Sequence, residues 1–169
     1  MLKIINNLSP FFEDGYRRIH VREYAKIMKI SPPTASTLLM SYYKEGLLNK
    51  TSERNYLLFN ADSKSKEFIE LSRIYWRNRL SELIDLIEKN SISPIIILFG
   101  SLSKAEAKSE SDIDIVIIGL KKELNLSQFE KKLKRNIQLF WFSSIKDIKN
   151  KDLQNNILNG YVLTGRLSL

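Results

Sequence analysis

The chain has 169 residues, of which 43% are apolar and 27% charged, and its net charge at pH 7 is +8. This length suits one or two small domains, and the basic balance favours an anionic partner such as nucleic acid or a nucleotide over an acidic one. Because cysteine is absent, disulfides and thiolate metal sites are excluded, and a reducing, cytoplasmic setting is expected. The first 12 residues lack the pattern of a signal peptide, and the longest apolar run, Ile95–Phe99, is too short to span a bilayer.

The first 60 residues are expected to form short helices followed by a hairpin. Apolar residues over 2–8 predict a first helix that stops near Pro10. Residues 17–21 are a candidate short strand, and residues 22–28 have the apolar spacing of an amphipathic helix.

A further helix is expected after residue 30. Ser31 is a good N-cap, and the two prolines that follow it are tolerated in a first helical turn. Apolar residues at helical spacing continue to Glu45, and Gly46 suits the C-terminal end of the helix. Residues 47–50 and 56–59 then predict two strands around a polar turn.

This order of helix, short turn, helix and two-stranded wing resembles the winged helix-turn-helix domains of prokaryotic regulators, and the run Ser-Pro-Pro-Thr-Ala-Ser…Leu…Gly-Leu-Leu carries the likeness. The resemblance implies that residues 32–45 form a recognition helix in the major groove of double-stranded DNA. The implied groove-facing residues are Pro33, Thr34, Thr37, Leu38 and Ser41, with Lys44, Lys50 and Arg54 near phosphates. Arginine, asparagine and glutamine, the usual base-reading residues, are missing from the groove-facing set. A dimerisation or protein-docking role therefore stays open beside DNA binding.

Residues 63–90 predict one long connecting helix. Its apolar side chains form a broad stripe: Phe68, Leu71, Ile74, Tyr75, Leu80, Leu83, Ile84 and Ile87. Their irregular spacing favours a packed connector over a coiled-coil dimer seam.

The remaining residues, 91–169, alternate between strand and helix patterns. Strands are expected over 95–99, 112–118, 137–142 and 161–163, and helices over 101–107, 127–135, 144–149 and 151–159. This alternation predicts a small mixed sheet with helices on one face, and the whole chain is expected to be of the α+β class. The expected division is a winged helix-turn-helix domain over 1–62, the connecting helix over 63–90 and a third part over 91–169.

Two short motifs in this third part point to chemistry. An apolar run ends at Gly100-Ser101, and after a spacer of ten residues Asp112 and Asp114 begin the next apolar run. Alternate residues of a strand share a face, so two like charges lie roughly 7 Å apart and repel unless a cation or basic group joins them. Magnesium is bound by such carboxylates together with substrate phosphates, and a Gly-Ser turn that opens a helix exposes N–H groups that bind phosphate. The alternatives are charges that protect a strand edge and a serine that only caps a helix.

These residues resemble the signature of the DNA polymerase beta-type nucleotidyltransferase superfamily, which is Gly-Ser followed by Asp-x-Asp on a strand. The spacer 102–111 and the closing segment 156–165 are most similar to its minimal prokaryotic branch, and the resemblance covers about residues 90 to 169. It implies a nucleotidyltransferase-like fold in which Asp112 and Asp114 ligate Mg²⁺ or Mn²⁺. It also implies that a nucleoside triphosphate such as ATP is held by Gly100, Ser101, Lys104 and Ser111.

One position departs from the family pattern. The family carries a third carboxylate on a later strand, and Gln138 occupies that position, in phase between two apolar residues. A glutamine carbonyl can coordinate magnesium but cannot accept the proton of an attacking hydroxyl. Lys104, where the family usually has arginine, is equally well explained as a solvated lysine. The basic cluster at 131–135 is expected to be the solvated face of a helix, and His20 to be structural.

Two functions are consistent with these patterns. The first is metal-dependent transfer of a nucleoside monophosphate from a nucleoside triphosphate to an unknown acceptor, with Asp112, Asp114 and Gln138 in the catalytic site. The alternative is a DNA-binding transcriptional regulator whose degenerate nucleotidyltransferase domain binds nucleotide or a partner without catalysis. Gln138 favours the regulator, and the intact motifs favour the enzyme. The resemblance to minimal nucleotidyltransferases also implies a helical partner protein, and the resemblance to winged helices leaves a homodimer open.

Overall fold

The computed structural model describes residues 2–167, and these fall into two compact units. The N-terminal unit runs to Ser72 and includes Ala105–Ser109, and the C-terminal unit consists of Arg73–Lys104 and the chain from Glu110 onward. Each unit is described by itself.

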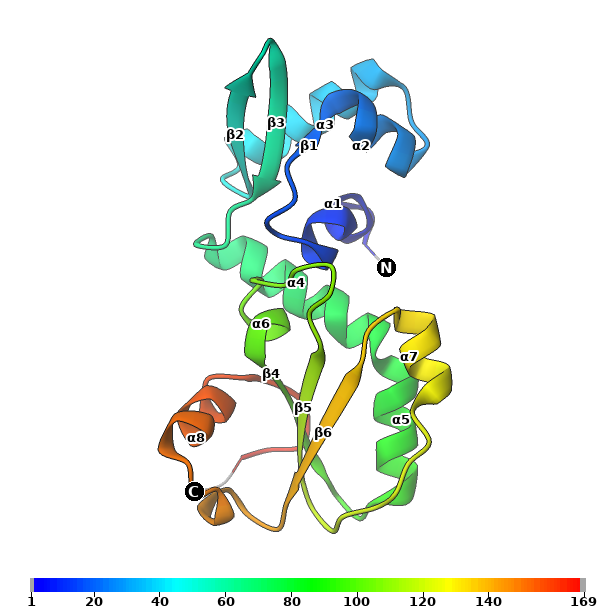
Figure 1. Ribbon diagram of the computed structural model, residues 1–169, viewed down its shortest axis with the longest axis vertical. Helices are drawn as coiled ribbons and strands as arrows, with labels where there is room; N and C mark the ends of the chain where they lie inside the picture. The colour runs from blue at the N-terminus through cyan, green and yellow to red at the C-terminus, as the bar shows by residue number, and fades with distance from the viewer. Residues whose placement is uncertain (1, 168–169) are drawn as a thin grey trace. The chain divides into compact units, whose positions relative to one another are not determined.

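The N-terminal unit begins with three helices, α1 (Lys3–Glu13), α2 (Val21–Met28) and α3 (Pro32–Lys44) (Figure 1). The prediction that the first helix stops near Pro10 is wrong, because α1 continues for three residues beyond this proline. A proline in a helix leaves the carbonyl four residues earlier without its N–H partner. Here the hydroxyl of Ser9 donates to that carbonyl, on Asn6, at 2.7 Å. The helix therefore continues and buries Phe11 and Phe12.

Side chains cap the starts of α2 and α3. The Ser31 hydroxyl, the predicted N-cap, accepts a hydrogen bond from the N–H of Thr34. Helix α3 buries Ala35, Leu39 and Tyr42, which are apolar residues at helical spacing. The expected structural role of His20 is confirmed, since its ring caps the start of α2.

A three-stranded antiparallel sheet completes the N-terminal unit. Its strands are β1 (Ile19–His20), β2 (Leu48–Glu53) and β3 (Tyr56–Ala61), in the spatial order β1-β3-β2. The hairpin turn is tighter than the five-residue turn expected, because Arg54 and Asn55 alone form it. Both have positive φ, 47° and 66°, as in the two-residue turns that match strand twist.

The single helix expected over 63–90 is two helices, α4 (Lys66–Arg79) and α5 (Ser81–Asn90). Leu80 separates them with φ −94° and ψ 0°, although its N–H still bonds to the carbonyl of Trp76 at 2.9 Å. The boundary between the two compact units falls inside α4.

A four-stranded mixed sheet forms the centre of the C-terminal unit. Its strands are β4 (Ile95–Phe99), β5 (Ile113–Ile118), β6 (Ile137–Phe142) and β7 (Tyr161–Thr164), in the order β6-β5-β4-β7. Strands β5 and β6 are parallel, and the other neighbours are antiparallel. The expected mixed sheet is therefore present.

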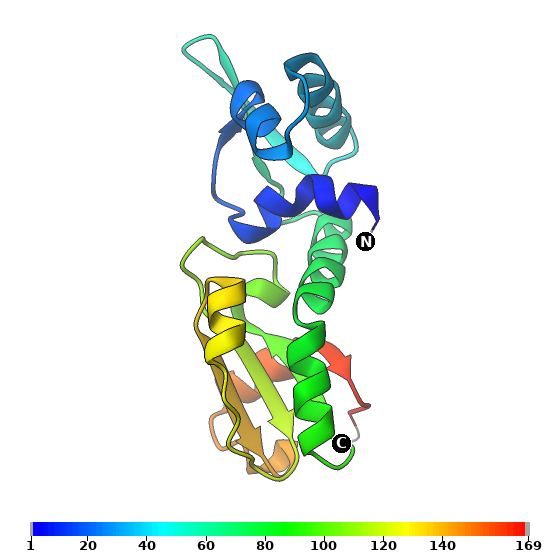
Figure 2. The same ribbon diagram turned by 90° about the vertical axis from the view of Figure 1, so that its right-hand side faces the viewer.

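Helices cover both faces of this sheet, so the prediction of helices on one face is wrong. Figures 1 and 2 show α5 and α7 (Ser127–Leu133) on one side, with α8 (Lys151–Leu158) and the 3₁₀ helix η1 (Ile145–Asp147) on the other. The physical reason is that β4 is apolar on both faces: Ile96 and Leu98 are fully buried on one, and Ile97 packs with Ile157 of α8 on the other. The helix expected over 101–107 is also shorter, because α6 (Gly100–Ser103) ends before Ala105, which has φ 57°.

Candidate nucleotide-binding site

The end of β4 and the start of β5 bring Gly100 against Asp114. The register pairs Phe99 with Asp114, so the glycine that follows β4 lies directly beside the aspartate. Gly100 has φ 70°, and an added Cβ would overlap the Oδ2 atom of Asp114 and lie 3.3 Å from its Cγ. The positive φ and the close approach both require glycine at this position.

The parallel pairing of β5 and β6 places Gln138 opposite Asp114, on the strand face that the sequence phase predicts. The Nε2 atom of Gln138 donates to Oδ2 of Asp112 at 2.6 Å. The Nδ2 atom of Asn136 donates to Oδ1 of the same carboxylate at 3.2 Å. Asp112 is therefore held by two side-chain amides. Sequence reasoning missed Asn136, although it lies two residues before Gln138 and so shares its strand phase.

The two carboxylates have different environments. Burial, followed by the charge of Asp112, raises the pKa of the Asp114 carboxyl above its ordinary value. A cation beside both groups would relieve the repulsion and favour the ionised form.

Asp112 and Asp114 fit a divalent cation only if it brings other ligands. Among residues 2–167 no group of three or more His, Cys, Asp or Glu side chains could hold a metal ion. Two carboxylates plus substrate phosphates is the usual arrangement for magnesium. The oxygen donors present here therefore suit an ion that arrives with a nucleotide.

The other candidate residues lie around this pair of strands. Ser101 is half-buried in the first turn of α6, and Ser111 is half-buried immediately before Asp112. Lys104 is exposed, and its Nζ lies 3.1 Å from Oδ1 of Asn156 on α8. Lys104 therefore forms a hydrogen bond with a side chain of the closing segment 156–165, and it is more than a lysine that contacts only solvent.

The expectation that residues 131–135 form a solvated face is wrong for Arg135, which is buried. Its Nη1 donates to the carbonyl of Ser111 at 2.6 Å, and its guanidinium lies 5.3 Å from the centre of the Trp76 ring. Lys132 forms an ion pair with Glu82 of α5. Arg135 therefore supports the segment that leads into Asp112, a role that its position in a lysine-rich run conceals.

In the N-terminal unit, the candidate DNA-contacting side chains of α3 are half-buried or exposed: Pro33, Thr34, Thr37, Leu38, Ser41 and Lys44. Their hydroxyls bond within the helix or at its cap: Thr37 donates to the carbonyl of Pro33, Ser41 donates to Glu45, and Thr34 shares a hydrogen bond with Ser31. On the hairpin, Lys50 lies 4.5 Å from the Tyr43 ring centre, and Arg54 is exposed at the turn.

Comparison with protein families identifies the class to which the C-terminal unit belongs. The family model for polymerase beta nucleotidyltransferases matches residues 81–167, just over half of the chain. The chain therefore belongs to the polymerase beta nucleotidyltransferase family, and the resemblance drawn from Gly-Ser and Asp-x-Asp is confirmed at that level. No curated protein matches the chain. Within residues 2–167 every helix is too short or too polar to cross a membrane.

Proposed function

We propose that the C-terminal unit transfers a nucleoside monophosphate from a nucleoside triphosphate to a hydroxyl group of an acceptor, with Mg²⁺ or Mn²⁺ as cofactor. The observation that carries this proposal is the contact of Gly100 with Asp114 beside Asp112, in a chain of the nucleotidyltransferase family. In such a reaction the acceptor oxygen bonds to the α-phosphorus, the bond from that phosphorus to the β-phosphate bridge breaks, and pyrophosphate leaves.

Each residue of the site has a proposed task. Asp112 and Asp114 would hold the ion, which when bound neutralises phosphate charge and polarises the reacting oxygens. Gly100 has no side chain, so the carboxylate of Asp114 can lie against its backbone. Ser101 and Ser111 supply hydroxyl groups nearby. Lys104 supplies a positive charge at the edge of the site. The acceptor proton passes to water, because the amide of Gln138 cannot accept it.

A second candidate function is supported by the two amides on Asp112. Gln138 and Asn136 donate to both oxygens of that carboxylate, which favours a site that binds nucleotide without turning it over. In that case the chain is a regulator whose C-terminal unit senses nucleotide or a partner protein.

For the N-terminal unit we propose a winged helix-turn-helix domain that binds nucleic acid. The order of its elements, with three helices and a three-stranded antiparallel sheet that ends in the β2–β3 hairpin, supports this assignment. Four further points stay predictions: the division of the chain at residues 62 and 90, a cytoplasmic location, a helical partner protein and a homodimer.

The transfer proposal is tested with triphosphates labelled at the α-phosphate, incubated with Mg²⁺ and with RNA, protein and small-molecule acceptors in turn. Label transfer with release of pyrophosphate, lost in Asp114→Asn and retained in Asp85→Asn, supports the enzyme. Asp85 is a matched control because it is an exposed carboxylate on α5. Magnesium-dependent nucleotide binding with no transfer supports a regulator that senses nucleotide. The absence of nucleotide binding overturns the enzyme and the nucleotide-sensing regulator, and leaves a regulator that senses a partner protein.

A further inference from the structure

The outer face of the N-terminal sheet carries a cavity beside the β2–β3 hairpin. Its volume is about 450 Å³, and it is lined by His20, Arg22, Glu53, Arg54, Tyr56 and Leu58. The register pairs His20 with Leu58 and Glu53 with Tyr56. Because alternate residues of a strand share a face, these four side chains lie on the face opposite to the buried Ile19 and Phe59. The cavity therefore opens on the solvent side of the sheet.

Two of the residues that line this cavity, His20 and Tyr56, carry rings that lie close together. The ring centres of His20 and Tyr56 are 5.8 Å apart, with an angle of 47° between their planes. Tyr56 is 58% exposed although it lies on a strand, so a large part of its ring meets solvent. A flat ring that is fixed on a strand and exposed is suited to stacking against an unpaired nucleobase.

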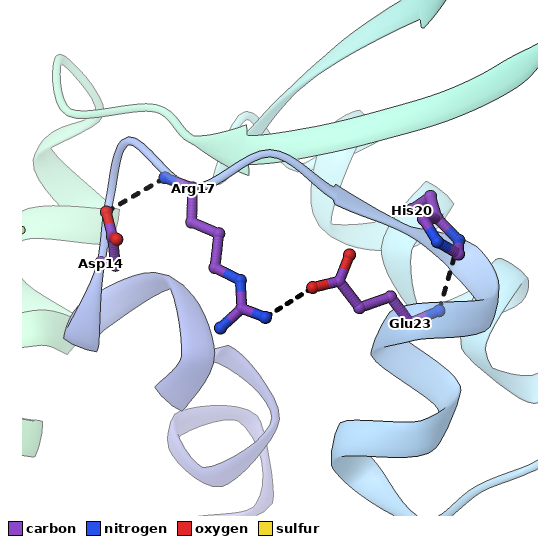
Figure 3. A network of polar contacts seen from close by, with 4 residues as sticks. All are labelled: Asp14, Arg17, His20 and Glu23. Carbon is purple, nitrogen blue, oxygen red and sulfur yellow. Dashed lines mark hydrogen bonds and ion pairs between the residues drawn. The ribbon is translucent and has the colours of Figure 1, made fainter. Parts of the chain in front are cut away.

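The His20 ring is held in one orientation by its surroundings. Figure 3 shows that its Nδ1 atom accepts a hydrogen bond from the N–H of Glu23, at 3.3 Å. The carboxylate of Glu23 is fixed in turn by an ion pair with Arg17, whose own N–H donates to Asp14. Since Nδ1 accepts, the neutral ring carries its proton on Nε2, which remains a hydrogen-bond donor.

The side chains that line the cavity carry a net positive charge. Glu53 is neutralised by an ion pair with Arg18. The guanidinium groups of Arg22 and Arg54 have no hydrogen-bond or ion-pair partner among residues 2–167. Arg54 is held at the tip of the hairpin by its place in the two-residue turn. Two guanidinium groups beside an exposed aromatic ring can contact the phosphates that flank a stacked base.

The outward face of α3 offers less to a nucleic acid. Its residues are small or apolar apart from Lys44, and the hydroxyls of Thr37 and Ser41 already donate within the helix. The cavity on the sheet face instead offers two rings, beside Arg54 of the hairpin turn and Arg22 of α2.

We propose that this cavity binds one unpaired nucleotide of a single-stranded nucleic acid, with the base stacked on Tyr56 and the phosphates contacted by Arg22 and Arg54. The inference rests on the proposed nucleic-acid role of the N-terminal unit and is independent of the transfer reaction. Such binding tolerates many sequences, because every base has a flat face.

The test uses the full-length chain and fluorescently labelled oligonucleotides: single-stranded DNA, single-stranded RNA and a DNA duplex. Binding is followed by fluorescence anisotropy at several salt concentrations. We expect at least one single strand to bind more tightly than the duplex. Tyr56→Ala should weaken that binding by about 5- to 150-fold, the range that one stacked base contributes, and Tyr56→Phe should restore most of it. Tyr16→Ala is the matched control, because Tyr16 is also 58% exposed.

The arginines give a separate readout. Arg54→Ala should reduce the slope of log affinity against log salt by about 0.7, the value for one phosphate contact on a single strand, whereas Tyr56→Ala should leave the slope unchanged. Circular dichroism and thermal melting of each variant show whether it is folded, and Tyr56→Phe keeps the test valid if Tyr56→Ala does not fold.

Three outcomes overturn the inference. In the first, the duplex binds more tightly than any single strand and its binding does not change in Tyr56→Ala. The N-terminal unit would then bind nucleic acid, but through a surface other than this cavity. Tight binding of free mononucleotides that is lost in Tyr56→Ala, with no gain for an oligonucleotide, would identify the cavity as a nucleotide site in place of a nucleic-acid site. No binding of any nucleic acid would overturn both this inference and the proposed role of the N-terminal unit.

Discussion

Replacing Gly100 with alanine should destabilise the protein in a way that reports directly on its contact with Asp114. Gly100 and Gly46 have nearly equal φ angles, 70° and 71°. An alanine in this left-handed region costs about 1–2 kcal/mol at either position. At Gly46 nothing lies within 4 Å of the added Cβ, so Gly46→Ala should cost only that amount.

At Gly100 the added methyl group also overlaps the carboxylate of Asp114 and lies 3.3 Å from its Cγ. Displacing a half-buried side chain of this kind adds about 1–3 kcal/mol. Gly100→Ala should therefore lower the free energy of unfolding by about 2–5 kcal/mol. At about 2–4 °C per kcal/mol for a chain of this size, the melting temperature should fall by roughly 4–20 °C.

Urea unfolding of the single and double variants separates the two contributions. In an Asp114→Ala background the overlapping atoms are gone, so the cost of Gly100→Ala should fall to that of Gly46→Ala, with a coupling energy of about 1–3 kcal/mol. If Gly100→Ala costs no more than Gly46→Ala, or if Asp114→Ala does not rescue it, the glycine and the aspartate are not in contact and the site geometry is wrong.

Three further predictions concern single side chains. Without metal, Asp114→Asn should be more stable than the wild type at pH 7, because the raised folded pKa penalises the ionised carboxylate. That advantage should fade as the pH falls through the raised pKa toward the ordinary value of about 3.9, where both states bind the proton. Gln138→Glu should replace the hydrogen bond to Asp112 with a charge repulsion, which should lower the melting temperature by about 4–10 °C in chelator. Addition of about 10 mM Mg²⁺ should recover part of this loss, because the ion binds the folded state. In the N-terminal unit, Asn7→Ala should cost about 1 kcal/mol in urea unfolding, because it removes the 2.8 Å hydrogen bond to the Tyr42 hydroxyl.

Each of these predictions has a control elsewhere in the chain. Asp85→Asn, at an exposed position, should show no pH-dependent gain, and Gln128→Glu should not make the melting temperature respond to Mg²⁺. Tyr42→Phe should cost about as much as Asn7→Ala. An Asp114→Asn variant that is less stable at pH 7, or a Gln138→Glu variant indifferent to Mg²⁺, would contradict the description of the site.

Local sequence signals predicted much of the C-terminal unit. The apolar run before Gly100 and the alternation of apolar and polar residues around Asp114 were sufficient to predict two strands. The alternation also predicted that Asp112 and Asp114 lie on the same face of their strand. The phase of Gln138 between apolar residues predicted its face, and the parallel register with Asp114 agrees with it. These predictions succeeded because the period of a strand is a local property.

Features that depend on a single neighbour could not be read from the sequence. The helix α1 passes Pro10 because a serine hydroxyl satisfies the carbonyl that proline leaves unpaired. The burial of Arg135 depends on a carbonyl 24 residues away, at Ser111, and on the Trp76 ring. The second amide on Asp112, from Asn136, needed the β5–β6 register to be known. In each case a long-range or side-chain contact decides the outcome, whereas periodicity describes only the segment itself.

The most direct test of the account is calorimetric titration of the chain with each of the four nucleoside triphosphates, in Mg²⁺ and in chelator. We predict that at least one triphosphate binds in Mg²⁺ and loses about tenfold or more of its affinity in chelator. We predict the same loss in Mg²⁺ for Asp114→Asn and none for Asp85→Asn. Binding of equal strength with and without metal, or unchanged in Asp114→Asn, would contradict the claim that Gly100, Asp112 and Asp114 form a metal-dependent nucleotide site.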